Sequence, residues 1–331
     1  MTKRPAPFET LELFIARTLR GSSSHGGALR LFVLCSMTLS AFALISPAAQ
    51  GTDIRLDQID PGRVQWHQVE FRAKKLGFSA DTGIEFTTVS AAEAGRELVE
   101  MSEGTGLAPS SDVLLMTVSS KGLGRDSRTR LWIDPEDTAA YQREQVDSGK
   151  KARYRAVRFS DRGVATTTRR PNSGEETKDN QQWTNASAGY AAFPHWAGTD
   201  LTVAESLSVF YVLSAAPFEK QGDRVQVPTF SKNNLLLLEL TLMGRQKVKV
   251  DYIEQSGSAE RRVKGSVEAL EILVDAKHLD PDSNEAHMEF MGLGGDITIL
   301  LDPTTRVPLE VSGKVKVAGN VKIRLQRAVL N

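Results

Sequence analysis

The sequence predicts a mainly β protein, built on a curved antiparallel sheet or open barrel with one or two packed helices. Three observations predict this fold: apolar and polar residues alternate with period two, turn-forming residues separate the alternating segments, and only two segments carry a helix start signal. The alternation is clearest from Val311 to Leu325, where the odd positions are apolar or Gly and most even positions are Lys, Arg or Asn. One face of such a strand is expected to be buried and the other wet.

The N-terminus has the order of a secretory signal. Residues 1–30 are basic on balance, and an apolar run, Leu31 to Ile45, follows. Small residues at Ser46 and Ala48 predict cleavage after Ala48, so residues 1–48 are interpreted as a signal peptide and the mature protein as periplasmic. An uncleaved anchor is the alternative, but the apolar run reaches about 22 Å, less than a hydrocarbon core of about 30 Å. The single Cys, Cys35, lies inside this run, so no disulfide is expected.

The mature chain is predicted to be one β-rich domain, residues 52–331. Besides the Val311 to Leu325 segment, which fits one bent strand or a tight hairpin, strands are predicted over residues 64–74, 83–89, 112–119, 128–133, 152–159, 224–227, 235–242, 246–254, 269–276 and 296–301. Turn residues such as Met243-Gly244-Arg245 and Asp302-Pro303-Thr304-Thr305 separate neighbouring strands and indicate a meander. The polar stretch 165–192 has no large aliphatic residue and is predicted as a loop, at which the sheet would divide if it forms two halves.

Two helices are predicted from capping boxes. Ser90 and Thr202 are each followed three residues later by Glu, so that hydroxyl and carboxylate can satisfy free backbone N–H groups. In the second segment, apolar residues recur at helical spacing from Val203 to Tyr211, and Pro217 closes it. That helix is expected to bury one apolar side.

Composition and motifs give no sign of catalysis. Lys plus Arg and Asp plus Glu both number 41, which argues against a nucleic-acid partner. There is no G-x-S-x-G, His67 and His195 each adjoin a Trp, and no cofactor loop is complete, so we expect no enzyme activity, no catalytic residue and no cofactor. The densest set of possible metal ligands lacks the Gly and the final Glu of a calcium loop, and is interpreted as a solvated turn rather than a metal site. That set is His278, Asp280, Asp282, Glu285, His287 and Glu289.

A local basic run suggests an anionic partner. Arg153, Arg155 and Arg158 lie in one predicted strand, within a longer basic stretch from Lys150 to Arg170. Outside the cytoplasm, lipid headgroups are natural partners for such a run, and these three arginines are the predicted headgroup-binding residues. A solvated strand face paired with nearby acids is the alternative.

Leu235 to Leu238 make both faces of one predicted strand apolar. Two explanations compete: the Thr202 helix covers the second face, or that face lines an apolar cavity. The predicted apolar lining comprises Leu207, Phe210, Tyr211, Leu236 and Leu238.

Residues 200–325 resemble a known bacterial envelope family, the domain of unknown function 3108. The resemblance rests on Leu207-Ser208-Val209-Phe210-Tyr211, Gln221-Gly222-Asp223, the strand pair around Met243-Gly244-Arg245, Arg306-Val307-Pro308-Leu309 and Val317-Ala318-Gly319-Asn320-Val321. The family often has an Arg soon after that Tyr, whereas Leu213-Ser214-Ala215 stand here, so no role of that Arg carries over. The resemblance implies an exported, sheet-rich, non-catalytic protein similar to half-barrel carriers of acyl chains in the periplasm.

Three functional hypotheses follow. The first is a non-catalytic periplasmic protein that binds a lipid-like apolar or amphipathic envelope molecule between the helix and the sheet. The alternative is a structural or scaffolding module of the cell envelope with a filled core, which packs on a partner protein. The third and weakest is a metal-dependent enzyme using His278 and His287.

Overall fold

The fold is described here from a computed structural model of the chain. The structure describes residues 51–75, 78–101, 103–122, 125–149, 151–197, 201–231, 234–279, 290–315 and 319–331. The predicted signal peptide and the segment Asp280 to Glu289, with most of the candidate metal ligands, lie outside these residues.

The protein is mainly β, as predicted, and its strands form one large curved sheet of 16 strands. The strand order is β1-β11-β12-β13-β14-β15-β16-β2-β3-β4-β5-β6-β7-β8-β9, with β10 beside β11. The bounds are β1 Asp53–Ile54, β2 Trp66–Lys75, β3 Phe78–Val89, β4 Val113–Gly122, β5 Arg125–Ile133, β6 Ala140–Asp147, β7 Arg153–Phe159, β8 Gly163–Arg170, β9 Asn185–Ala192, β10 Ala204–Glu205, β11 Arg224–Ser231, β12 Asn234–Ser256, β13 Ala259–His278, β14 Gly294–Leu301, β15 Pro308–Val315 and β16 Gly319–Leu330.

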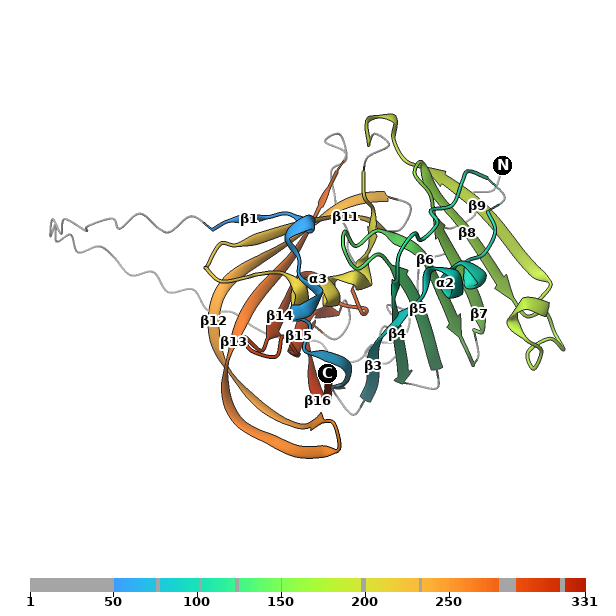
Figure 1. Cartoon of the computed structure of the whole chain (residues 1–331). Coiled ribbons are helices and arrows are strands. Elements are labelled where there is room, and N and C mark those ends of the chain that lie inside the picture. The colour runs from blue at the N-terminus through green and yellow to red at the C-terminus, as the bar shows by residue number, and fades with distance from the viewer. Residues whose placement is uncertain are drawn as a thin grey trace, which may run out of the picture.

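Most neighbouring strands are antiparallel and consecutive in sequence, which is the predicted meander. The exceptions bring distant segments together: β16 pairs with β2, and β1 and β10 each run parallel to β11. The far end of β12 also pairs with β16, so β12 to β16 return on themselves in a ring that is not a true barrel. Figure 1 shows two arms of the sheet, β12–β13 on one side and β4–β9 on the other, with helix α3 between them.

The longest hairpin corrects a predicted turn. Met243-Gly244-Arg245 does not end a strand; β12 runs through it, and its register against β13 shifts between Leu242 and Gly244. Such a β-bulge adds one residue to a strand and bends it while pairing continues, and Gly244 adopts a φ of 142° that few other residues tolerate. The two strands predicted at 235–242 and 246–254 are therefore one. The Val311 to Leu325 segment is the hairpin β15–β16, with Val315 opposite Gly319.

The predicted polar loop at 165–192 is wrong over much of its length. Its two ends form β8 and β9, which pair with each other from Gly163 opposite Ala192 to Arg170 opposite Asn185. These strands lie at one end of the sheet order, so the stretch does not divide the sheet. The pattern does not reveal them because β9 is largely exposed and β8 is only partly buried after Val164, so neither strand needs apolar alternation. Strand β6 is likewise absent from the prediction.

The described residues contain two α-helices, α2 (Ala91–Glu97) and α3 (Val209–Ala215). The predicted cap of α2 is confirmed, because the Ser90 hydroxyl accepts a hydrogen bond from the Glu93 N–H. The cap predicted at Thr202 is wrong: Ala204 and Glu205 pair with β11 instead, and Glu205 caps the short helix η5 (Ser206–Ser208) that leads into α3. Further 3-10 turns are η1 (Leu56–Gln58), η2 (Pro61–Arg63), η3 (Asn180–Gln182) and η4 (His195–Ala197).

No helix in the described part of the chain is long and apolar enough to cross a membrane. The main apolar core lies on the concave face of the sheet and around α3, and two smaller clusters lie on the opposite face. Helix α2 belongs to one of these smaller clusters, where Ala94 packs with Val113, Trp132 and Tyr141.

Candidate functional site

The five predicted lining residues are all buried. Phe210 and Tyr211 on α3 are 1% and 2% exposed, and Leu236 and Leu238 on β12 are 2% and 0% exposed. Leu207, in η5, is 9% exposed. All but Leu236 belong to the main apolar core. These side chains therefore meet other side chains of the protein, not an open surface.

Aromatic side chains from three parts of the chain pack around α3. The Phe210 ring lies 6.2 Å from that of Phe71 and 5.1 Å from that of Phe290, measured between centroids. The Tyr211 ring meets the Phe86 ring edge to face at 6.1 Å. The Tyr211 hydroxyl donates to the Pro135 carbonyl at 2.6 Å, so its polar end is satisfied too. The space between α3 and the sheet is occupied by these rings.

The N-terminal segment covers another side of α3. The Asp60 N–H donates to the Ala215 carbonyl at 3.0 Å, where the helix ends. All seven residues of α3 are buried, so this helix is buried on every side and not along one stripe as predicted. The apolar run from Leu235 to Leu238 is explained mainly by packing: Leu235 also joins the main core, and only Leu237 is partly exposed.

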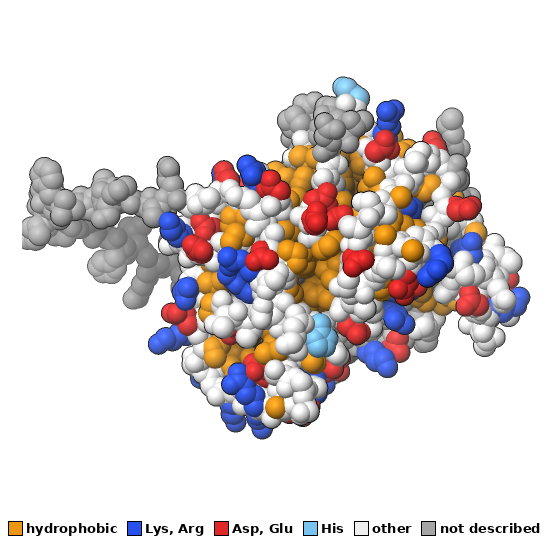
Figure 2. All heavy atoms as spheres, in the orientation of Figure 1, with side chains coloured by type: hydrophobic (Ala, Val, Ile, Leu, Met, Phe, Trp, Pro, Cys, Tyr) orange, Lys and Arg blue, Asp and Glu red, His pale blue; other side chains and the backbone are white. Residues whose placement is uncertain are grey.

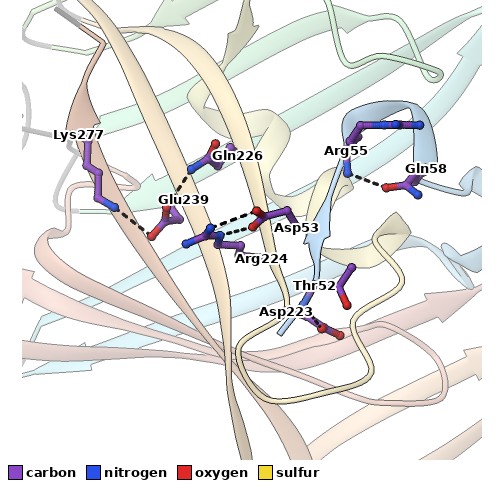
Figure 3. A network of polar contacts seen from close by, with 9 residues as sticks. All are labelled: Thr52, Asp53, Arg55, Gln58, Asp223, Arg224, Gln226, Glu239 and Lys277. Carbon is purple, nitrogen blue, oxygen red and sulfur yellow. Dashed lines mark hydrogen bonds and ion pairs between the residues drawn. The ribbon is translucent and has the colours of Figure 1, made fainter. Parts of the chain in front are cut away.

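A polar network fixes this covering segment to β11, as Figure 3 shows. The Asp223 carboxylate accepts hydrogen bonds from the N–H groups of Thr52, Glu219 and Lys220 at 2.8–2.9 Å. Burial by itself would raise the pKa of Asp223, but the hydrogen bonds from Lys220, Thr52 and Glu219 outweigh it and the pKa lies below its usual value. Beside this group, Arg224 forms a two-pronged ion pair with Asp53, and Gln226 and Lys277 each donate to Glu239 at 3.0 Å.

The three predicted headgroup arginines do not share a face. Arg153 and Arg155 lie on the concave face with Val157 and Phe159, which are in the main core. Arg158 is on the opposite face, because side chains two residues apart share a face and those an odd number apart do not. It is 6% exposed and donates to the carbonyls of Tyr141 at 2.6 Å and of Leu107. Arg158 is therefore structural, and its inclusion in a headgroup site is wrong.

The structure adds Arg143 to the concave pair. Arg143 on β6 donates to the Glu205 carboxylate at 3.1 Å and to the Gln145 side chain at 3.0 Å. Arg153 donates to Asp147 at 2.8 Å. We call Arg143, Arg153 and Arg155, with Asp147 and Glu205, the concave arginine cluster. Strand β6 is mostly polar from Gln142 to Asp147 and shows no apolar alternation, so Arg143 could not be placed from the sequence.

The cluster carries three guanidinium groups against two carboxylates. Burial and the charges of Arg143 and Arg153 lower the pKa of Arg155 to about 10. Burial likewise lowers the pKa of Arg158 to about 10 on the other face. Thr166 and Thr168 of β8 lie next to the cluster on the concave face and are partly exposed. The cluster therefore borders an accessible polar surface.

A separate groove of about 350 Å³ lies on the convex side of the sheet, where Gly83 leaves a gap between polar side chains. Its lining is mostly polar or charged and includes Glu70, Arg72, Asp81 and Lys121. Arg72 and Asp81 form an ion pair across it at 2.6 Å. This lining does not match an apolar ligand.

Within the described residues, no group of three or more His, Cys, Asp or Glu is placed to hold a metal ion. His278 ends β13, whereas its five predicted companions lie outside the described residues. His67 has a hydrogen-bonding neighbour in Asn331, at 3.2 Å.

The fold and site define a mainly β protein with one curved sheet, a helix enclosed by aromatic side chains, and an arginine cluster on the concave face. Comparison of the chain with protein-family models, with curated proteins and with solved structures gives no match. The family resemblance noted in the sequence therefore stays a prediction.

Proposed function

We propose that the chain is a non-catalytic structural module of the cell envelope that presents a rigid sheet to a partner protein. The observation that carries this proposal is the filled core around α3. Phe71, Phe86 and Phe290 occupy the space in which a lipid chain would have to lie, and Phe210 and Tyr211 are at most 2% exposed. Among the described residues, an apolar ligand could enter the space between α3 and these rings only by displacing them.

The exposed end of the sheet supports a role in association. Strand β9 ends the strand order, and among the described strands only β8 pairs with it. Its sequence, Asn185 to Ala192, contains no charged residue and no Pro, the usual devices that prevent pairing with another chain. Hydrophobic side chains also gather in the middle of the face drawn in Figure 2, between the two arms. Both features suit contact with a protein partner.

Export to the periplasm remains part of this proposal. It rests on the basic region and the apolar run that precede Ala48 in the sequence.

Native mass spectrometry of protein purified from the periplasm tests the filled core. We expect the mass of the processed polypeptide alone, with nothing recovered by solvent extraction. A bound lipid in most molecules would contradict the proposal and restore the carrier hypothesis. Replacement of Ala188 in β9 by Pro should leave the melting temperature within a few degrees, because the residue is exposed and the β8–β9 register turns its N–H away from β8. The same change should abolish association through β9 in size-exclusion or cross-linking experiments.

A second candidate function, binding of an anionic amphipathic molecule on the concave face, is favoured by the concave arginine cluster. Arg143 and Arg153 are 27% and 12% exposed at their side chains, beside the threonines of β8. Co-sedimentation with vesicles containing anionic phospholipid tests it. An Arg155→Gln variant should lose at least half of the binding, whereas Arg262→Gln, the same charge change on the distant β12–β13 hairpin, should retain it. Equal binding by both variants would dismiss this function.

A further inference from the structure

A short turn between β14 and β15 holds two polar groups that the fold leaves unsatisfied. Two backbone hydrogen bonds close the turn. The Arg306 N–H donates to the Asp302 carbonyl at 3.0 Å, and the Asp302 N–H donates to the Val307 carbonyl at 2.9 Å. The Asp302 carboxylate accepts from the N–H groups of Thr304 and Thr305 at 2.9 and 2.8 Å. The backbone of the turn is thus rigidly defined.

Arg306 is an unusual residue for its position. It is 7% exposed, and its φ of 59° lies in the left-handed region, where Gly or Asn would be the ordinary choice. Among the described residues, the buried Nη1 of Arg306 has no hydrogen-bond partner, and neither has the buried Oγ1 of the adjacent Thr305. Buried polar groups are nearly always paired, so two unpaired buried atoms in consecutive residues, one of them on a charged group, call for an explanation.

Burial lowers the pKa of Arg306, and the charges of Arg63 and Arg245 lower it further, while Asp302 and Glu219 act in the opposite direction. Arg63 and Arg245 each have a carboxylate partner of their own, Asp60 at 3.9 Å and Glu268 at 3.4 Å. Arg63 comes from η2, Arg245 from the strand after the β12 bulge, and Arg306 from the β14–β15 turn. Of these three arginines, Arg306 is the one whose guanidinium has a buried nitrogen without a hydrogen-bond partner among the described residues.

The backbone of Arg306 is held firmly. Its carbonyl accepts hydrogen bonds from the Trp66 indole N–H and from the Ser214 hydroxyl, each at 2.9 Å, and Ser214 also contacts the indole at 3.1 Å. These contacts attach the turn to β2 and to α3. They fix the backbone that carries the Arg306 side chain, but none of them is a hydrogen bond to its guanidinium group. A preorganised donor group of this kind is what an anion site requires.

We propose that Arg306 and Thr305 form a binding site for a small phosphate-type oxyanion. The oxyanion would accept hydrogen bonds from Arg306 Nη1 and from the Thr305 hydroxyl, and its negative charge would offset that of the buried Arg306 guanidinium. This site lies in the β14–β15 turn, apart from the concave arginine cluster, and it does not depend on the proposed function.

Isothermal titration calorimetry of the mature protein tests the proposal, with sodium phosphate and with glycerol 3-phosphate as probes in chloride buffer of matched ionic strength. Binding of both probes identifies a site for free phosphate, and binding of glycerol 3-phosphate alone identifies a site for a phosphorylated group of a larger molecule. Absence of binding by either probe would overturn the proposal.

Variants place the binding at this turn. Arg306→Gly suits the positive φ and removes the guanidinium group, so it should fold at least as stably as the wild type in chloride while it weakens phosphate binding about tenfold or more. Thr305→Val should weaken binding by a smaller factor. Arg262→Gln, which removes an exposed arginine elsewhere, should bind like the wild type. Unchanged binding by Arg306→Gly, or a crystal structure in phosphate with only ordered water at Arg306, would contradict the assignment.

Discussion

The Asp223 carboxylate accepts a hydrogen bond from the Thr52 N–H at 2.9 Å, although the two residues are 171 positions apart in the sequence. This bond fixes the segment that runs over α3, and the neighbouring Arg224 N–H donates to the Thr52 carbonyl at 2.9 Å. The enclosure of α3 therefore depends on polar contacts at the edge of the sheet as well as on apolar packing.

Asp223→Asn should lower the free energy of unfolding by roughly 2 kcal/mol at pH 7, because the carboxylate accepts three backbone N–H bonds. The pKa of Asp223 in the folded protein is lower than its ordinary value of 3.8, so the charge stabilises the fold above that value. This contribution disappears as the pH falls through the folded pKa. Urea unfolding of both proteins at several pH values should show the difference narrowing in acid; a constant difference would contradict this account.

Gly51→Ala should destabilise the protein, because a Cβ at this position would lie 1.8 Å from the Gly222 carbonyl carbon. The covering segment would have to move away from β11. Gly95→Ala is the matched control: Gly95 is exposed in α2 with nothing within 4 Å of a new Cβ, so this change should stabilise by about 0.5–1 kcal/mol. Thermal unfolding of the two variants should shift in opposite directions, and equal shifts would argue against the close approach at Gly51.

Phe210→Ala should cost about 3–5 kcal/mol of stability, because the ring is 1% exposed and packs against Phe71 and Phe290. Met243→Ala, at the exposed bulge of β12, is the control and should change stability by about 0.5 kcal/mol or less. Chemical denaturation measures both. A small cost at Phe210 would indicate a loosely filled core and would weaken the structural-module proposal.

Glu175 should remain ionised well below the pH at which an ordinary glutamate becomes protonated. The N–H groups of Thr184 and Asn172 and the Thr184 hydroxyl donate to its carboxylate and lower its pKa to about 2. Because the folded pKa is depressed, the stabilisation of this loop is present above the ordinary value of 4.5 and disappears as the pH falls toward 2. An NMR titration of the Glu175 carboxyl carbon measures the midpoint, and the Trp183 indole N–H, which donates to the Glu175 carbonyl at 3.0 Å, reports loop order. A midpoint near 4.5 would exclude these bonds in solution.

Part of the candidate site could be predicted from the sequence. Phe210, Tyr211, Leu236 and Leu238 were expected to lie between a helix and the sheet, and Arg153 and Arg155 share a face as strand alternation requires. The same prediction groups Arg158 with these two arginines. Arg158 lies an odd number of positions from each of them, however, so strand alternation places it on the opposite face. Arg306 follows a turn that the sequence does indicate, but its contacts with Trp66 of β2 and Ser214 of α3 form only in the folded protein.

The alternating pattern by itself determined the mainly β class, the meander and most of the strands, because one buried face per strand is a local property that residues two apart must satisfy. Tertiary structure decided the start of α3, where pairing of Ala204 and Glu205 with β11 overrides a local capping signal. It also decided that β9 is a strand and that α3 is enclosed on all sides, since both depend on partners far away in the sequence. Filling of the space beneath α3 is a property of the side chains that meet there, and no single segment encodes it.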